Sequence, residues 1–102
     1  MKIRDYSPEE AKAEYDKQTE FIDVREPDEF AEARIPGAKL IPMSEMNNRV
    51  TEIPNDKDVV IYCRTGNRSA YLVSILEQNG YQNLINLAGG IVSWYEEGFP
   101  VE

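Results

Sequence analysis

Hydrophobic residues of this chain gather in short runs, and helical patterns fill the segments between them. Three of the runs predict strands: "FIDV" at 21–24, "DVVIY" at 58–62 and "NLINL" at 83–87. The run at 58–62 is apolar almost throughout, which is typical of a central strand covered on both faces. A further extended piece is expected at 38–43, "AKLIPM".

The first helix has a clear start signal. Ser7 is a capping residue, Pro8 takes the first helical position and Glu10 completes a capping box. In the helix expected at 69–79, apolar residues recur at helical spacing and Gly80 follows as a stop. The other helical segments are expected at 27–33, from a cap at Ser44 to about 53, and at 91–97.

Strands interleaved with helices predict an α/β fold, with a mainly parallel central sheet flanked by helices on both faces. The 102 residues suffice for one hydrophobic core, so we expect a single domain over residues 1–102. In such sheets ligands bind beyond the carboxyl ends of the strands. Cys63 directly follows the strand at 58–62, so this end of the sheet is the expected site.

Acidic residues outnumber basic ones, 19 to 11, which gives a net charge of −8. That balance argues against nucleic acid and anionic membranes as partners, because both attract a positive surface. No apolar stretch reaches the length of a membrane span, and the first residues lack the apolar core of a signal peptide. With one cysteine, the composition favours a reducing compartment, and we expect a cytoplasmic location.

The chain contains no histidine and one cysteine. A Ser-His or Cys-His pair is therefore excluded, and so are an internal disulfide and a multi-thiolate metal site. We expect no metal and no cofactor. Any nucleophile in this protein has to be activated by fixed charges and backbone dipoles.

Cys63 is followed by a polar turn, Arg-Thr-Gly-Asn-Arg at 64–68. Gly66 is free to take a positive φ, and successive N–H groups of such a turn can converge on an anion. With the next helix adding its positive N-terminal end, the pKa of the thiol should fall well below its free value of about 8.5. No Asp or Glu occurs from Val59 to Leu76, so we expect no carboxylate close to the thiol. The alternative interpretation of Cys63 is that it serves only as a small buried hydrophobic residue.

The segment "CRTGNRS" at 63–69 resembles the active-site loop of rhodanese-domain sulfurtransferases. Further motifs follow in the family's order: "DVRE" at 23–26, "EF..ARIPGA" at 29–38, "IP" at 41–42, "LAGG" at 87–90, Trp94 and "GFPV" at 98–101. The chain departs from the pattern at Ala33-Arg34, where the family most often has Gly-His. The sequence allows two placements of Arg34: at the mouth of the pocket, where it would add positive charge, or on the open surface.

The resemblance implies an enzyme that carries sulfur as a persulfide on Cys63. The thiolate attacks the outer sulfur of a small anionic donor such as thiosulfate and releases sulfite, and no cofactor beyond this covalent intermediate is needed. Cyanide, a thiol or a sulfur-accepting protein then takes the terminal sulfur. Sulfite leaves as a stable anion, so the reaction needs no general acid and tolerates the lack of histidine.

Substrate binding is expected from the loop itself. Arg64 and Arg68 are expected to bind the anionic donor and to favour the thiolate, with Arg68 the stronger candidate. Thr65, Gly66 and Asn67 complete the substrate-binding loop through their backbone N–H groups.

Three residues are expected to support the loop structurally: Ser69, and Asp23 with Arg25 as a hydrogen-bonded pair. The Gly89–Gly90 pair should permit a tight turn between strand and helix, and Trp94 should lie in the core.

Three other functions compete with sulfur transfer. A docking module of the same fold typically lacks the cysteine, which is present here. A tyrosine-phosphatase-like enzyme resembles this site, but its loop has five residues between Cys and Arg, whereas four separate Cys63 from Arg68. A redox-sensing thiol has no resolving cysteine available in this chain.

Overall fold

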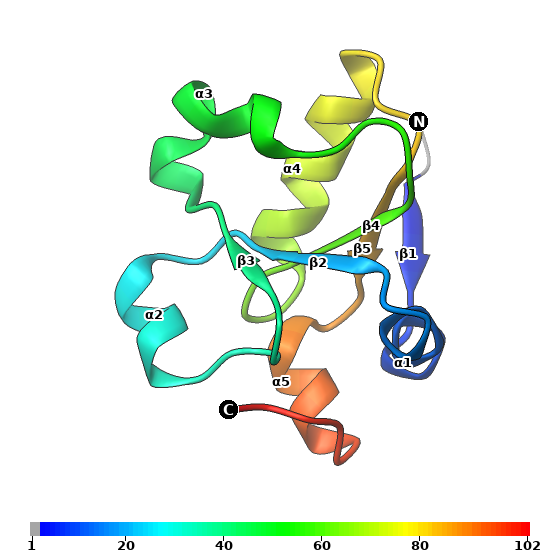
Figure 1. Ribbon diagram of the computed structural model, residues 1–102, viewed down its shortest axis with the longest axis vertical. Helices are drawn as coiled ribbons and strands as arrows, with labels where there is room; N and C mark the ends of the chain where they lie inside the picture. Colours follow the sequence, from blue (N-terminus) through cyan, green and yellow to red (C-terminus); the bar gives the residue numbers. More distant parts are fainter. Residues whose placement is uncertain (1–2) are drawn as a thin grey trace.

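A five-stranded sheet forms the centre of the protein in the computed structural model, which describes residues 3–102 (Figure 1). The strand order is β1-β5-β4-β2-β3, and every pair of neighbours is parallel. The strands are β1 (Arg4–Tyr6), β2 (Glu20–Asp23), β3 (Lys39–Leu40), β4 (Val59–Tyr62) and β5 (Leu84–Leu87). The α-helices are α1 (Pro8–Asp16), α2 (Pro27–Glu32), α3 (Met46–Arg49), α4 (Asn67–Gln78) and α5 (Gly90–Glu96), and two 3₁₀ turns, η1 (Met43–Glu45) and η2 (Val50–Glu52), flank α3.

The central strand β4 packs against helices on both of its faces. Val59 and Ile61 belong to the core cluster formed with α3 and α4. Val60 and Tyr62, which point the opposite way, belong to the cluster formed with α1 and α5. Figure 1 shows the same division, with α4 and α3 on one side of the sheet and α1 and α5 on the other. The predicted α/β fold with a parallel sheet and helices on both faces is confirmed.

The predicted strands at 21–24, 58–62 and 83–87 correspond to β2, β4 and β5, whereas only two residues of the extended piece at 38–43 form a strand. The capping box of α1 is present: the Ser7 hydroxyl accepts from the Glu10 N–H at 3.2 Å, and Glu10 accepts from the Ser7 N–H at 2.9 Å. The predicted domain also includes residues 1 and 2, which lie outside the described residues.

Strand β1 was not predicted from the sequence. Its three residues are polar or half-buried and show no apolar alternation. They form a strand because they pair with β5, in a register that places Arg4 beside Ile85 and Tyr6 beside Leu87. Tertiary pairing decides the structure of such a short edge segment.

The predicted helix capped by Ser44 is wrong in two respects. The segment is broken into η1, α3 and η2, and Ser44 lies inside η1, whose capping position is Pro42. The Ser44 hydroxyl instead donates to Glu26 Oε1 at 2.7 Å. The residues at 47–51 include two asparagines, a valine and a threonine, which are weak helix formers and do not sustain a continuous helix.

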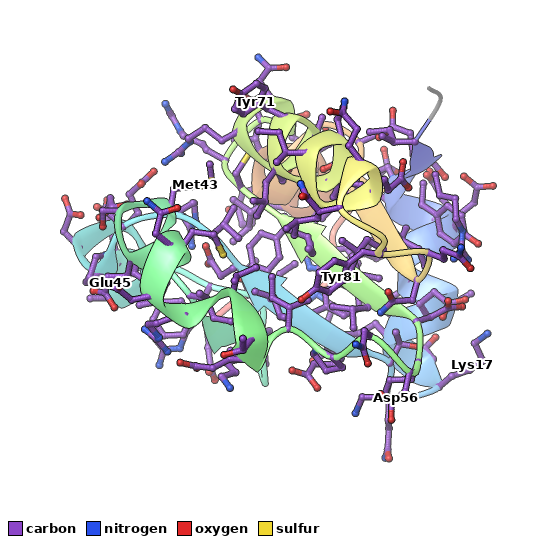
Figure 2. All side chains as sticks on the ribbon, turned by 90° about the horizontal axis from the view of Figure 1, so that it is seen from above. Lys17, Met43, Glu45, Asp56, Tyr71 and Tyr81 are labelled. Atoms are coloured by element: carbon purple, nitrogen blue, oxygen red, sulfur yellow. The ribbon has the colours of Figure 1, made fainter. Side chains whose placement is uncertain are left out.

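A shallow groove of about 460 Å³ runs between α3 and α4 and is lined mainly by apolar side chains, among them Met43, Leu72 and Tyr81. Figure 2 shows Met43 and Tyr81 in this region, with Tyr71 of α4 projecting from the surface. None of the helices within residues 3–102 combines the length and the apolarity that crossing a membrane requires.

Candidate active site

Cys63 lies at the carboxyl end of β4, in the turn that leads into α4. Gly66 caps this helix with φ +96°, a left-handed conformation that glycine adopts without strain. The helix begins at Asn67, two residues earlier than predicted, so Asn67 and Arg68 belong to its first turn and not to the loop. The apolar β4 strand therefore delivers the thiol directly to a helix N-terminus.

Three donors converge on the Cys63 sulfur. The Gly66 N–H donates to Sγ at 3.2 Å, the Ser69 N–H at 3.4 Å and the Ser69 hydroxyl at 3.3 Å. Cys63 is 1% exposed and Ser69 is fully buried, so these donors act with little competition from water. The sulfur occupies the cradle that the sequence pattern indicated.

The cradle lowers the pKa of the thiol. Burial raises the pKa of Cys63, but the three hydrogen bonds from Ser69 and Gly66, with a smaller contribution from the Thr65 amide, outweigh burial, so the pKa lies below its ordinary value. A thiolate is the form that acts as a nucleophile. Ser69, expected only as loop support, is thus a direct partner of the sulfur.

The two arginines of the loop are differently placed. Arg64 is exposed, and within residues 3–102 its side chain has no hydrogen bond or ion pair. Arg68 is bound by Glu29 of α2, with Nη1 to Oε1 and Nη2 to Oε2 both at 3.1 Å. The acid-free stretch does not keep carboxylates away from Arg68, because α2 brings Glu29 to this guanidinium from 39 residues away.

Asp23 and Arg25 form the expected pair. The two side chains are buried, with Arg25 Nη2 2.7 Å from Asp23 Oδ2, and the Asp23 carboxylate also accepts the Arg25 N–H at 2.9 Å. The Arg25 guanidinium also donates to the Ala33 carbonyl at 2.6 Å. Arg25 therefore links the Asp23 carboxylate at the end of β2 to the carbonyl that follows α2.

The turn that carries Cys63 is held from the opposite side by α5. The Ile91 N–H donates to the Cys63 carbonyl at 3.0 Å, and the Val92 N–H donates to the Arg64 carbonyl at 3.1 Å. This approach requires Gly90, because a Cβ there would lie 2.5 Å from the Cys63 carbonyl oxygen. The sequence indicated a tight turn at Gly89–Gly90. The structure adds that this turn brings the start of α5 into contact with the cysteine loop.

No role for Asn86 was predicted from the sequence. From β5 its Nδ2 donates to Asp5 Oδ1 at 2.8 Å and to the Gly66 carbonyl at 3.4 Å, which links the edge strand to the loop. Asn86 is 2% exposed, and its Oδ1 has no partner within residues 3–102. The available signal was an asparagine among the apolar residues of "LINL" at 84–87.

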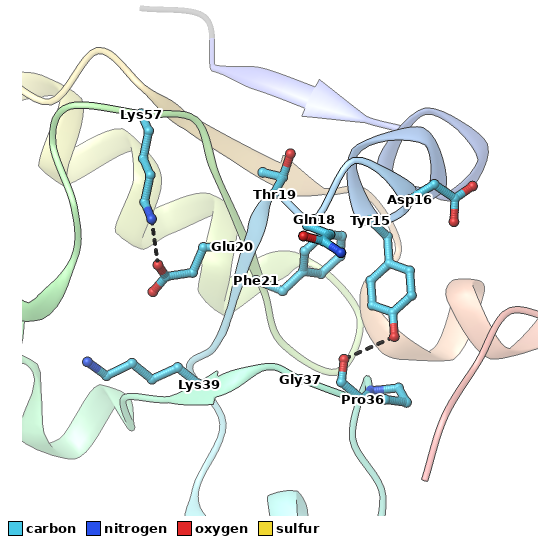
Figure 3. A pocket seen from close by; sticks show the side chains of 10 residues that line it. All are labelled: Tyr15, Asp16, Gln18, Thr19, Glu20, Phe21, Pro36, Gly37, Lys39 and Lys57. Atoms are coloured by element: carbon cyan, nitrogen blue, oxygen red, sulfur yellow. Dashed lines mark hydrogen bonds and ion pairs between the residues drawn. The ribbon is translucent and has the colours of Figure 1, made fainter.

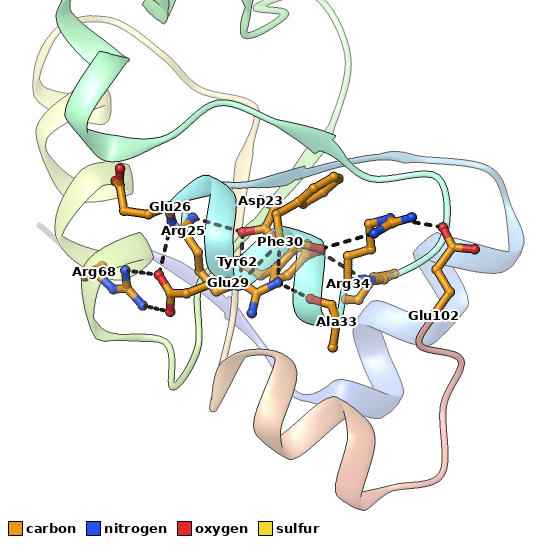
Figure 4. A network of polar contacts seen from close by, with 11 residues as sticks. Asp23, Arg25, Glu26, Glu29, Phe30, Ala33, Arg34, Tyr62, Arg68 and Glu102 are labelled. Atoms are coloured by element: carbon orange, nitrogen blue, oxygen red, sulfur yellow. Dashed lines mark hydrogen bonds and ion pairs between the residues drawn. The ribbon is translucent and has the colours of Figure 1, made fainter.

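A cavity of about 350 Å³ opens beside the loop and is lined by Arg25, Glu29, Glu32, Ala33 and Arg64. Figure 4 shows Glu29 between the guanidinium groups of Arg68 and Arg25. Glutamates and arginines are equally numerous in this lining, so its charges balance.

Arg34 does not line this cavity. It donates to the Phe30 carbonyl at 3.2 Å and pairs with Glu102 at 3.2 Å (Figure 4). Trp94 is fully buried and donates to the Pro100 carbonyl at 2.7 Å, which confirms its place in the core.

A larger cavity, about 760 Å³, lies at the other end of the strands (Figure 3). Its lining includes Glu20, where β2 begins, and Lys57, which precedes β4, and these two residues form an ion pair at 3.4 Å. Tyr15 in the same cavity donates to the Pro36 carbonyl at 3.1 Å. Cys63 is not among its lining residues, so size alone does not identify the reactive site.

Known proteins are similar to this chain in sequence and in fold. The family model for the rhodanese-like domain matches residues 7–97. A protein from Allochromatium vinosum named sulfurtransferase is 46% identical over 80 residues, covering 78% of this chain and 75% of that protein. The crystal structure of a rhodanese-related protein from Thermoplasma volcanium has a TM-score of 0.89 at 36% identity and covers 97% of both chains.

A structure from Rhodopseudomonas palustris, described as a possible tyrosine phosphatase, has a TM-score of 0.86 at 23% identity and covers 98% of this chain and 85% of that chain. This likeness shows a shared fold only.

The chain belongs to the rhodanese-like domain family, as its motifs predicted. The family and the relative named sulfurtransferase support a role in sulfur transfer.

Proposed function

We propose that this domain is a sulfurtransferase that carries sulfane sulfur as a persulfide on Cys63. The donor is a small anion such as thiosulfate, and the acceptor is a thiol, a protein thiol or, in an assay, cyanide. The observation that carries the proposal is the set of three donors on the Cys63 sulfur, which lowers the pKa of a buried thiol in a loop of the rhodanese type.

In the first half-reaction the Cys63 thiolate attacks the outer sulfur of the donor. The donor's S–S bond breaks, and sulfite leaves with the bonding electrons while the Cys63 persulfide remains. Both thiolate and persulfide are anions, so the amides of Gly66 and Ser69 can stabilise the site before and after transfer. No proton has to be delivered to the leaving group.

In the second half-reaction the acceptor attacks the terminal sulfur of the persulfide. The bond between the two sulfur atoms breaks, and the Cys63 thiolate is regenerated as the leaving group. The Ser69 hydroxyl, 3.3 Å from Sγ, stabilises that leaving thiolate. The same donors therefore serve both half-reactions.

The direct test is the intact mass of the protein after incubation with thiosulfate and removal of the excess. We expect wild type to gain the mass of one sulfur atom and to lose it on addition of cyanide, with formation of thiocyanate. Cys63→Ala is the control and should gain nothing. Sulfur mass on that variant, or none on wild type, would overturn the proposal.

A further inference from the structure

The positive charge beside the thiol is partly cancelled by a carboxylate from another part of the chain. Arg68 stands in the first turn of α4, and its guanidinium is held by both oxygens of Glu29. In the adjoining cavity, Arg25 is ion-paired with Asp23, and Arg64 shares the lining with Glu29 and Glu32. An incoming anion therefore meets amide dipoles and one unpaired arginine, and not a cluster of free cations.

Glu29 is a permanent counter-ion. The hydrogen bonds from Arg68 lower the pKa of Glu29 to about 2, against an ordinary value of 4.5. The carboxylate therefore stays charged at every pH at which the protein works. Glu29 also accepts the Glu26 N–H at 3.1 Å, which anchors the carboxylate at the start of α2.

We propose that Glu29 is a specificity-determining residue, which makes the site prefer sulfur donors with one negative charge over donors with two. This inference rests on the proposed sulfurtransferase function. A dianion is repelled by Glu29 about twice as strongly as a monoanion at the same position, because the Coulomb energy scales with the product of the charges. The favoured donors are thiosulfonates and persulfides, and thiosulfate is disfavoured.

Two small donors differ by this one charge and share the same chemistry. With thiosulfate, the thiolate takes the outer sulfur and sulfite leaves as a dianion. With methanethiosulfonate, CH₃SO₂S⁻, the thiolate takes the outer sulfur and methanesulfinate leaves as a monoanion. In both cases one S–S bond breaks and one forms, the leaving group keeps the electron pair of the broken bond, and no external oxidant or reductant takes part.

Glu29→Gln removes the charge and keeps the shape. The amide oxygen of Gln can still accept the Glu26 N–H, so the start of α2 keeps its hydrogen bond. Asp28→Asn is the matched control, because it removes one charge from the neighbouring residue of the same helix, which is exposed and does not line the cavity. Glu29→Ala carries the same expectation and replaces Glu29→Gln if that variant does not fold.

The experiment compares kcat/KM for the two donors with cyanide as the common acceptor. We expect Glu29→Gln to raise the ratio of thiosulfate to methanethiosulfonate efficiency by about three- to tenfold. The change should lie in KM for thiosulfate, and Asp28→Asn should move the ratio by less than about twofold. An unchanged ratio in Glu29→Gln, or an equal rise in Asp28→Asn, overturns the assignment of specificity to Glu29.

The two proposals fail in different ways. If wild type gains no sulfur mass from either donor, the sulfurtransferase function itself is wrong. If wild type transfers sulfur from both donors and Glu29→Gln keeps the wild-type ratio, the function stands and only the role of Glu29 is wrong. Inhibition by sulfate and by methanesulfonate gives a second readout, because the two anions differ by one charge and neither donates sulfur. We expect Glu29→Gln to strengthen inhibition by sulfate relative to inhibition by methanesulfonate.

Discussion

The loop of Cys63 and helix α2 contribute to the same site by different physics. The loop acts through neutral dipoles that come from residues close in sequence, such as the Gly66 and Ser69 amides. Helix α2 acts through a full charge that comes from far away in sequence, the Glu29 carboxylate on Arg68. If Glu29 selects the charge of the donor as proposed, activation of the nucleophile and selection of the donor are carried by separate parts of this protein.

The largest expected effect comes from adding a side-chain atom between α5 and the turn that carries Cys63. In Gly90→Ala the new Cβ would meet the Cys63 and Arg64 carbonyls, and the residue has φ +61°. We expect a loss of at least about 1 to 3 kcal/mol in the free energy of unfolding, together with a loss of persulfide formation. Urea unfolding and intact mass measure the two effects.

Gly98→Ala is the matched control for that variant. Gly98 also has a positive φ, +81°, but a Cβ there would meet nothing within 4 Å. It isolates the cost of the left-handed backbone, about 1 kcal/mol. If both variants lose the same stability and both still form the persulfide, the close approach of α5 does not hold the turn.

Ser69→Ala should raise the pKa of Cys63 more than Arg68→Ala does. The hydroxyl donates directly to the sulfur, whereas the guanidinium already pairs with Glu29. A hydrogen bond to a charged group is worth about 1.5 to 3 kcal/mol, so the midpoint should rise by about one pH unit or more. The measurement is the rate of Cys63 alkylation against pH. A larger shift in Arg68→Ala would show that charge, and not the cradle, activates the thiol.

The smallest expected effect concerns stability at low pH. The pKa of Glu29 is lowered to about 2 in the folded protein, so its contribution to stability is present above the ordinary value of 4.5 and is lost as the pH falls through about 2. Since this ion pair is partly exposed, the difference between wild type and Glu29→Gln should be under about 1 kcal/mol at pH 6. Thermal unfolding at pH 6 and pH 2 tests the sign, and a difference that grows on acidification contradicts it.

The fold and the nucleophile were predictable because their signals are local. The apolar run at 58–62 indicated a central strand, and the residues after Cys63 indicated a turn rich in amide donors. Even the helix start at Ser7 follows from residues within three positions of one another, Ser7, Pro8 and Glu10. Such features depend on residues that are close in sequence, so the sequence pattern predicts them.

The features that were missed depend on tertiary contacts. Strand β1 forms only by pairing with β5, and Asn86 reaches both Asp5 and the Gly66 carbonyl across the sheet. The acid-free stretch around Cys63 did not reveal the partner of Arg68 for the same reason, because Glu29 arrives from another helix. A charge count along the chain does not measure the charge around a folded site.

The contact between α5 and the cysteine turn has a consequence for biosynthesis. Cys63 is translated well before Ile91 and Val92, whose N–H groups bind the Cys63 and Arg64 carbonyls. While the ribosome is still adding the last residues of α5, the turn lacks both of these contacts. A nascent or truncated chain that ends before α5 therefore lacks both of the hydrogen bonds that hold the cysteine turn from this side.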